Sequence, residues 1–249
     1  MHQVHLRAAW ITTSAGCFIG FFAANGNYAV QQTIWTLLAL ASGLTIMYAV
    51  ARGRIWARSA WSTVASATGI IVLISVAGIV TDTPRQAQGV ASTIFGTLLT
   101  AVFALLTVAA YLMVSRHRRI VSDSSGIVDA AIVFVAAAMV ATQFLLYPFW
   151  TDPALTTSQR IGLLVFDGLN VLLLSFTVRL WFSTDRTVNR ASRILAIGFL
   201  AMIISGGLGI TESLPVQVLD PPLIANLIFA STMIFFAMSA AAALDATAS

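Results

Sequence analysis

The chain has 249 residues, of which 59% are hydrophobic and only 9% are charged, and its formal net charge is +4. Soluble domains carry about 25% charged residues, and a water-soluble fold of this length could not hide so much apolar surface. The composition therefore excludes a water-soluble domain and predicts an integral membrane protein. Every basic residue is Arg, so the chain has no lysine for a retinal Schiff base. In a membrane protein this basic balance indicates orientation in the bilayer rather than a nucleic-acid partner.

Eight apolar segments follow one another along the chain, each long enough to cross a bilayer. The expected helices cover residues 6–24, 28–51, 58–81, 88–114, 126–149, 159–182, 191–212 and 220–244. Turn-forming and helix-breaking residues mark their boundaries, most clearly Asn25-Gly26-Asn27, Thr83-Pro84-Arg85, Asp152-Pro153 and Pro221-Pro222. We expect an all-α integral membrane protein, a bundle of about eight transmembrane helices that forms one domain over residues 1–249. A parallel repeat of four plus four spans, over 1–115 and 116–249, is a further expectation.

Arginines are concentrated in every second loop between the expected spans. The arginine-rich loops follow the second, fourth and sixth spans and contain Arg52, Arg54, Arg58, Arg116, Arg118, Arg119, Arg186, Arg190 and Arg193. The opposite loops contain Arg85 and Arg160 together with acidic residues. By the positive-inside rule, this alternation predicts that both termini are cytoplasmic. The Ala-rich, Lys-free composition is typical of a GC-rich bacterial genome, so the expected location is the inner membrane of a bacterium.

Asp167 is the most informative polar residue, because it lies well inside the sixth expected span. A carboxylate at the centre of a bilayer costs about 2.5–3.5 kcal/mol on insertion scales, so such a residue usually faces the bundle interior or a wet cavity. A candidate pocket, open to the outside, combines it with polar residues expected near it: Thr142, Gln143, Asn170, Ser205 and Asn226. One interpretation is binding of a small molecule, a lipid or an ion. The alternative is a hydrogen-bonded knot that locks the bundle.

Asp129 and Arg179 form a second candidate pair. Each lies about one turn from the expected cytoplasmic end of its span, Asp129 in the fifth and Arg179 in the sixth. Antiparallel neighbouring helices would bring both side chains to the same depth, which makes an ion pair geometrically reasonable. The pair would clamp the two helices or act as a switch, and Arg179 could instead reach the lipid headgroups.

Residue patterns of known enzymes and metal sites are missing from the sequence. The three histidines, His2, His5 and His117, fall in a tail and a loop without metal-ligand spacing. No GxSxG segment and no phosphate-binding glycine-rich loop occurs. We therefore expect no catalytic residue, no metal and no cofactor. The single Cys17 follows Ser14-Ala15-Gly16, which leaves lipidation as an alternative to a small buried residue of the first span.

Most of the chain, most clearly residues 110–212, resembles a known family. The segment Arg116-His117-Arg118-Arg119, then Gly126-Ile127-Val128-Asp129-Ala130, then Asp167 to Arg179 and the arginine-rich loop after it, resembles the N-terminal multi-span membrane region of actinobacterial GGDEF/EAL proteins. Proteins of that family make or hydrolyse cyclic di-GMP. The resemblance implies a sensory or scaffolding membrane region whose last helix continues into a cytoplasmic output domain. The chain itself contains no GGDEF or EAL segment, so neither activity is assigned to these residues.

The expected function is that of a non-enzymatic membrane sensor or scaffold, which passes a signal to a cytoplasmic output domain or partner. The main alternative is a small secondary transporter that uses Asp167 as a proton or cation site. A lipid-modifying enzyme and a purely structural anchor are further alternatives. The small-residue runs Gly16-x-x-x-Gly20 and Ser205-Gly206-Gly207-x-Gly209 allow close helix packing, either within the bundle or in a homodimer.

Overall fold

The computed structural model describes residues 27–52, 57–81, 90–118, 156–182, 186–211 and 221–245, together with residue 55 and scattered residues between 13 and 24 and between 128 and 150. These residues form helices and their connecting turns, and no strand occurs among them. The long helices are α2 (Tyr28–Ala51), α3 (Arg58–Thr81), α4 (Val90–Arg118), α7 (Thr157–Trp181), α8 (Arg186–Thr211) and α9 (Pro221–Asp245).

Five of these helices are long and apolar enough to cross a membrane. The candidate spans are Ala29–Ala51, Arg58–Ile79, Ile94–Arg116, Thr157–Trp181 and Leu227–Leu244. At 1.5 Å per residue, even a 24-residue helix such as α2 is about 36 Å long and exceeds the hydrocarbon core of a bilayer. The prediction of an all-α membrane protein is therefore confirmed for the part of the chain that the structure describes.

Six of the eight expected segments coincide with these helices. The bounds of α2 and α3 match the expected ones at both ends, whereas α4 continues to Arg118 and α8 begins at Arg186. Hydropathy marks only the part of a helix that lies in lipid, and arginine continues a helix readily beyond that part. The expected spans 6–24 and 126–149 fall on segments of which only scattered residues are described, so these two spans stay predictions, as does the repeat.

Helices α2 and α7 begin where the sequence provides capping groups. Asn27, the last residue of the predicted turn, accepts a hydrogen bond from the Val30 backbone N–H through its Oδ1 at 3.2 Å. At the start of α7, Thr156 and Gln159 form a capping box, in which each side chain accepts a hydrogen bond from the other residue's backbone N–H. These side chains satisfy amides that have no partner within the helix.

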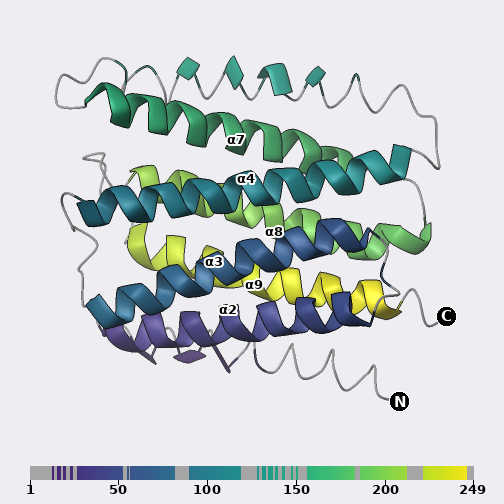
Figure 1. Cartoon of the computed structure of the whole chain (residues 1–249), viewed down its shortest axis with the longest axis horizontal. Helices are drawn as coiled ribbons and strands as arrows, with labels where there is room; N and C mark the ends of the chain where they lie inside the picture. Colours follow the sequence, from purple (N-terminus) through teal and green to yellow (C-terminus); the bar gives the residue numbers. More distant parts are fainter. Residues whose placement is uncertain are drawn as a thin grey trace.

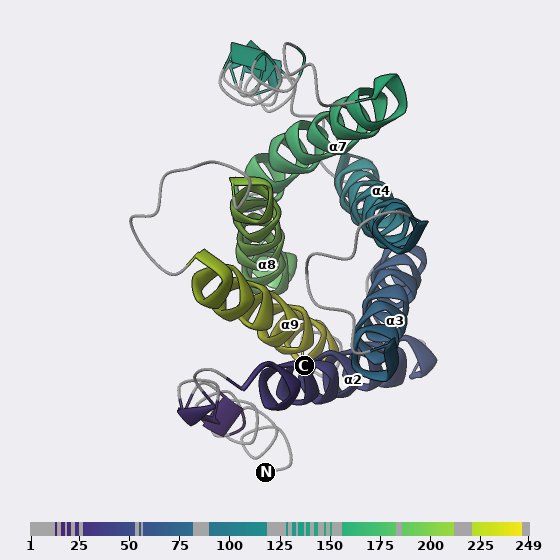
Figure 2. The same cartoon turned by 90° about the vertical axis from the view of Figure 1, so that its left-hand side faces the viewer.

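The six helices form a closed ring in the order α2, α3, α4, α7, α8 and α9, and α9 packs against α2 to complete it. Figure 2 shows this ring end-on, and Figure 1 shows the helices lying nearly side by side. The described residues between 128 and 150 lie outside the ring, beside α7 (Figures 1 and 2). Many large apolar side chains of the described helices face outward, among them Leu37, Leu44, Leu73, Ile161 and Leu200, which is the surface expected against lipid tails.

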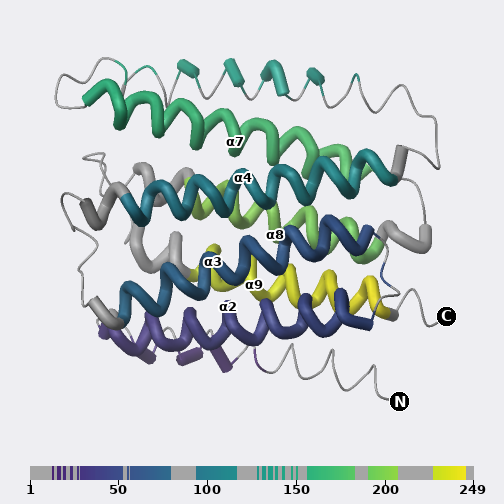
Figure 3. Tube along the Cα trace, viewed as in Figure 1, coloured from purple at the N-terminus to yellow at the C-terminus, as the bar shows by residue number. Residues whose placement is uncertain are grey.

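The directions of α4 and α7 constrain the connection between these two helices. Helices α4 and α7 are neighbours that run in the same direction, so α4 ends at one end of the bundle and α7 begins at the other (Figure 3). The chain between Arg118 and Thr156 must therefore return along the length of the bundle. Parallel neighbours need such a crossover connection.

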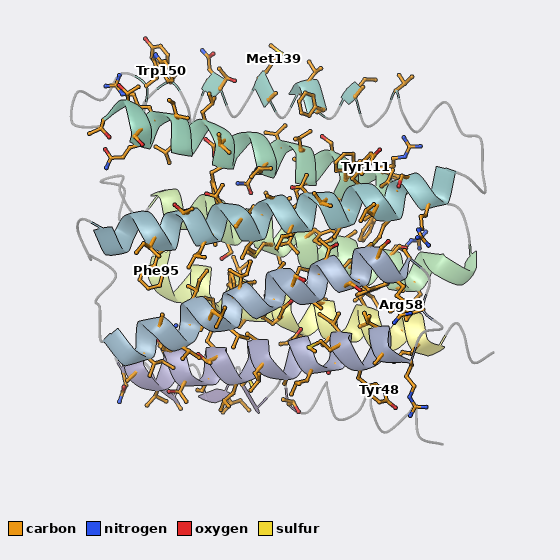
Figure 4. The ribbon with its side chains drawn as sticks, in the orientation of Figure 1. Tyr48, Arg58, Phe95, Tyr111, Met139 and Trp150 are labelled. Carbon is orange, nitrogen blue, oxygen red and sulfur yellow. The ribbon has the colours of Figure 1, made fainter. Side chains whose placement is uncertain are left out.

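Arginines cluster at one end of the ring. Arg52 follows α2, Arg58 starts α3 and Arg116 lies in the last turns of α4, and all three are exposed. In Figure 4, Arg58 and Tyr48 lie at this end, and Phe95 lies toward the opposite end. The Arg52 guanidinium donates a hydrogen bond to the Tyr48 hydroxyl and lies 5.0 Å from the centre of its ring.

Candidate functional site

Asp167 lies near the middle of α7 and is only 4% exposed. Its burial agrees with the expectation that a carboxyl group in a membrane helix faces the protein. Among the described residues, its carboxyl group takes part in no hydrogen bond and no ion pair. The group is therefore removed from solvent without a partner that would stabilise a negative charge.

Three helices meet at the residue that precedes Asp167. The Phe166 ring packs edge-on against Phe103 of α4, with 4.7 Å between the ring centres. Gly206 of α8 lies against both rings, since a β-carbon at position 206 would be 3.0 Å from Cζ of Phe103 and 3.3 Å from Cζ of Phe166. The absence of a side chain at position 206 lets α4, α7 and α8 approach one another here.

A polar contact joins α4 to α7 two residues after Asp167. The Thr107 hydroxyl lies 2.8 Å from the Phe103 carbonyl oxygen of its own helix and 3.4 Å from the Leu169 carbonyl oxygen of α7. Thr107 is buried. This contact, together with the Phe103–Phe166–Gly206 junction, fixes the segment of α7 that carries Asp167.

No charged side chain approaches Asp167 from the helices beside it. Residues 90–115 of α4 and residues 194–211 of α8 contain no Asp, Glu, Lys, Arg or His. On α7 itself the nearest charged residues are Arg160 and Arg179, which lie about 10 and 18 Å away along the helix axis at 1.5 Å per residue. Asp167 is thus an isolated acid in the apolar middle of the ring.

Asn170 lies one turn after Asp167 on the same helix. Its side-chain amide donates a hydrogen bond to the Phe166 carbonyl oxygen at 3.0 Å, whereas its Oδ1 is buried and accepts no hydrogen bond from any described residue. Residues three apart are neighbours on a helix surface. Two acceptors that have no donor among the described residues, the Asp167 carboxylate and the Asn170 Oδ1, therefore lie one turn apart on α7.

Thr142 and Gln143, which the sequence placed at a similar depth, are both exposed. The Thr142 hydroxyl donates to the Ala138 carbonyl oxygen at 2.7 Å, and no hydrogen bond joins either residue to Asp167 within the described part of the chain. The segment that carries them lies on the outer side of α7 (Figure 2). Their membership of a common pocket stays a prediction.

The remaining pocket residues lie on α8 and α9. Ser205 is buried and lies two helical turns after Gly198, on the same helix face. Gly198 packs against Phe235 and Phe236 of α9, so Ser205 lies on the side of α8 that faces α9 rather than α7. Asn226 belongs to the second turn of α9, and its side chain lies outside the described residues.

Of the second candidate pair, Asp129 and Arg179, the structure describes only Arg179. Arg179 lies in the last turn of α7 and is half-buried, where a cation is favoured by the helix dipole. Asp129 lies outside the described residues, so the ion pair stays a prediction. Cys17 is a half-buried free thiol, and no group of three His, Cys, Asp or Glu side chains able to hold a metal occurs in the described ranges.

The packing of α8 on α9 was not anticipated from the sequence. A β-carbon at Gly198 would lie 2.8 Å from Cδ1 of Phe236 and 3.2 Å from Cβ of Phe235, and the Ser239 hydroxyl donates to the Ala191 carbonyl oxygen at 2.6 Å. A glycine at the centre of an apolar helix is the signal that could have indicated this contact.

No family model, no curated protein and no solved structure matches the chain.

Proposed function

We propose that this chain is the membrane-embedded sensory or scaffold region of a bacterial signal-transduction protein, in which Asp167 is the point of control and α9 is the output helix. The observation that carries the proposal is the burial of an isolated carboxyl group where α4, α7 and α8 meet. Burying a charge without a partner is costly, so any event that changes the charge or its surroundings favours a different packing of these helices.

Contacts between neighbouring helices support a route from Asp167 to α9. Helix α8 packs against α7 on one side and against α9 on the other. The Gly198–Phe236 contact and the hydrogen bond from Ser239 to Ala191 join α8 and α9 closely. A shift of α8 relative to α7 would therefore carry α9 with it, as in other helix-shift transitions of about 1–2 Å.

The orientation in the membrane follows from the arginines. The end of the ring that holds Arg52, Arg58 and Arg116 would be cytoplasmic by the positive-inside rule, and α9 ends there as well (Figure 1). With the return connection between α4 and α7 as one crossing and a further crossing before α2, the chain would have about eight spans and two cytoplasmic termini. The location would be the inner membrane of a bacterium.

The resemblance to actinobacterial GGDEF/EAL proteins supplies the proposed output, a cytoplasmic domain or partner of cyclic di-GMP signalling. The signal would be a small molecule, a lipid or a state of the membrane that favours one packing around Asp167. Such a signal must bind the two packings with different affinity. The chain would act without chemistry of its own, as a monomer or as a homodimer.

Distances between spin labels test this proposal directly. In a Cys17→Ser background, Ser59→Cys on α3 and Arg193→Cys on α8 provide two exposed labelling sites. The distance between the labels, measured by pulsed electron resonance in lipid nanodiscs at alkaline pH, where the parent carboxyl group is ionised, should differ between the parent protein and Asp167→Asn. The control Ser175→Ala removes a buried hydroxyl on the same helix, bonded only to Val171, and should leave the distance unchanged. Identical distances in Asp167 and Asp167→Asn would contradict the proposal.

A small secondary transporter is the second candidate, because an isolated intramembrane acid is also what a proton-coupled or cation-coupled carrier requires. Flux of protons or monovalent cations into proteoliposomes distinguishes the two. A sensor should show no flux above that of empty liposomes, whereas a transporter should show flux that Asp167→Asn abolishes and Ser175→Ala preserves.

A further inference from the structure

We propose that Asp167 and Asn170 form a proton-binding site within α7, in which the protonated Asp167 carboxyl group donates its hydrogen bond to Asn170 Oδ1. The inference rests on the proposed function, because it names the proton as the ligand that acts at the point of control. The observation that carries it is a carboxyl group, 4% exposed, one helical turn before a buried amide oxygen that has no donor among the described residues.

The hydrogen-bonding capacity of the two side chains decides which ligand fits. An ionised carboxylate only accepts hydrogen bonds, and so does the amide oxygen of asparagine. Asn170 uses one of its two amide N–H groups on the Phe166 carbonyl oxygen, and its buried Oδ1 accepts no hydrogen bond from a described residue. Two neighbouring acceptors cannot satisfy each other, but one added proton turns the carboxyl group into a donor for the amide oxygen.

The charges around the site leave no alternative counter-ion on the neighbouring helices. Residues 90–115 of α4 and 194–211 of α8 are free of acidic and basic side chains, and so are residues 130–151 of the segment beside α7. On α7, Arg160 and Arg179 lie two and more turns away along the helix. The close packing of Phe103, Phe166 and Gly206 fixes the residue before Asp167. A proton is the smallest cation that neutralises the acid, so it fits this packing best.

The consequence for packing follows from the same geometry. With the proton bound, the carboxyl group is neutral and the ring packs as described. When the proton leaves, the carboxylate requires water or another donor, and the contact of α7 with α8 must open to admit it. The site would thus couple proton binding to the position of α8, and through Gly198 and Ser239 to α9.

Infrared difference spectroscopy on the full chain in lipid tests the site without reference to any output. The spectrum of the parent protein minus that of Asp167→Asn isolates the C=O stretch of one protonated carboxylic acid. We expect this band to be present at acid and neutral pH, to disappear reversibly at alkaline pH, and to shift in frequency in Asn170→Leu. Ser175→Ala is the matched control and should leave the band unchanged. If Asn170→Leu fails to fold, the presence of the band in the parent protein and its loss at alkaline pH still test the site.

Two outcomes would overturn the site. The first is the absence of the band at every pH at which the protein stays folded. The second is its loss on adding sodium chloride, but not choline chloride, at constant pH, which would identify a metal cation as the ligand. The spin-label distances separate this inference from the proposed function. If the infrared band is present but the spin-label distances do not change in Asp167→Asn, only the sensor is refuted. If the distances change in Asp167→Asn but no band is found, only the proton site is refuted.

Discussion

Gly198 of α8 packs so closely on Phe236 of α9 that a β-carbon at position 198 would lie 2.8 Å from Cδ1 and 2.9 Å from Cε1 of the phenyl ring. Phe236 is fully buried and also packs edge-on against Phe199, with 5.6 Å between ring centres. The ring cannot retreat easily, because the neighbouring Phe235 lies against the same glycine. This contact holds α8, the helix that follows α7, closely against α9.

Gly198→Ala should therefore destabilise the protein, by about 1–3 kcal/mol, because overpacking a filled interface forces side chains and backbone apart. The matched control is Gly162→Ala on α7, where a β-carbon would meet nothing within 4 Å. That change should be neutral or stabilising, since alanine favours the helix by about 1 kcal/mol. Unfolding in detergent, followed by circular dichroism, measures both. Equal effects of the two substitutions would contradict the close contact.

Gly206→Val should disturb the junction of α4, α7 and α8, because a β-carbon there already approaches the Phe103 and Phe166 rings to 3.0 and 3.3 Å. A smaller side chain at position 103 should make room for the added methyl groups. We expect Phe103→Leu to recover part of the loss when it is combined with Gly206→Val, although it destabilises on its own. A double-mutant cycle of unfolding free energies measures this coupling, and strictly additive effects would show that the two residues do not touch.

At alkaline pH, where the carboxyl group is ionised, Asp167→Leu should raise the free energy of unfolding by about 1–3 kcal/mol, because it removes a buried charge that has no partner among the described residues. Leu172→Asp provides the control on the exposed, lipid-facing side of α7 and should impair insertion. Thermal unfolding of the purified variants, together with the amount recovered from membranes, tests both expectations. A loss of stability in Asp167→Leu would instead support the hydrogen-bonded knot that locks the bundle.

Ser239→Ala should cost about 0.5–1.5 kcal/mol, the value of a hydrogen bond between membrane helices, because it removes the bond from the Ser239 hydroxyl to the Ala191 carbonyl oxygen. Ser231→Ala on the same helix is the control, since its hydroxyl bonds only to Leu227 within α9. Unfolding free energies of the two variants should differ by most of that amount. Similar values would mean that the link between α8 and α9 does not depend on Ser239.

The positions of the helices were predictable because length and hydropathy alone define a membrane span. The bounds of α2 and α3 follow from the polar segments on either side. The end of α4 at Arg118 and the start of α8 at Arg186 could not be predicted from hydropathy. Arginine lies outside the hydrocarbon core but still continues a helix readily. The order of neighbours in the ring, with α9 closing on α2 through Trp35 and Phe229 at 4.3 Å between ring centres, depends on side-chain shape, which hydropathy does not contain.

The candidate site was predictable only in part, for a related reason. The burial of Asp167 followed from the cost of a charge in lipid, and the structure confirms it. The prediction that groups Asp167 with Thr142, Gln143 and Ser205 used only their depth in the membrane. Depth does not indicate which face of a helix a residue occupies. The structure shows Thr142 and Gln143 exposed and Ser205 buried on α8, and the membership of these residues in one pocket stays a prediction. Asn170 lies three residues after Asp167 on the same helix, so its nearness to Asp167 follows from helix geometry alone.

The proposed sensor requires Asp167 to be enclosed by the ring at membrane depth, and thiol accessibility in intact cells tests this enclosure most directly. In a Cys17→Ser background, a cysteine introduced by Asp167→Cys should not react with a membrane-impermeant maleimide from either side of the membrane. Arg58→Cys should react from one side only, and Leu172→Cys should stay unreactive because it faces lipid. Rapid labelling of the Asp167→Cys variant from either side would show an open aqueous path to α7 and would contradict the buried site.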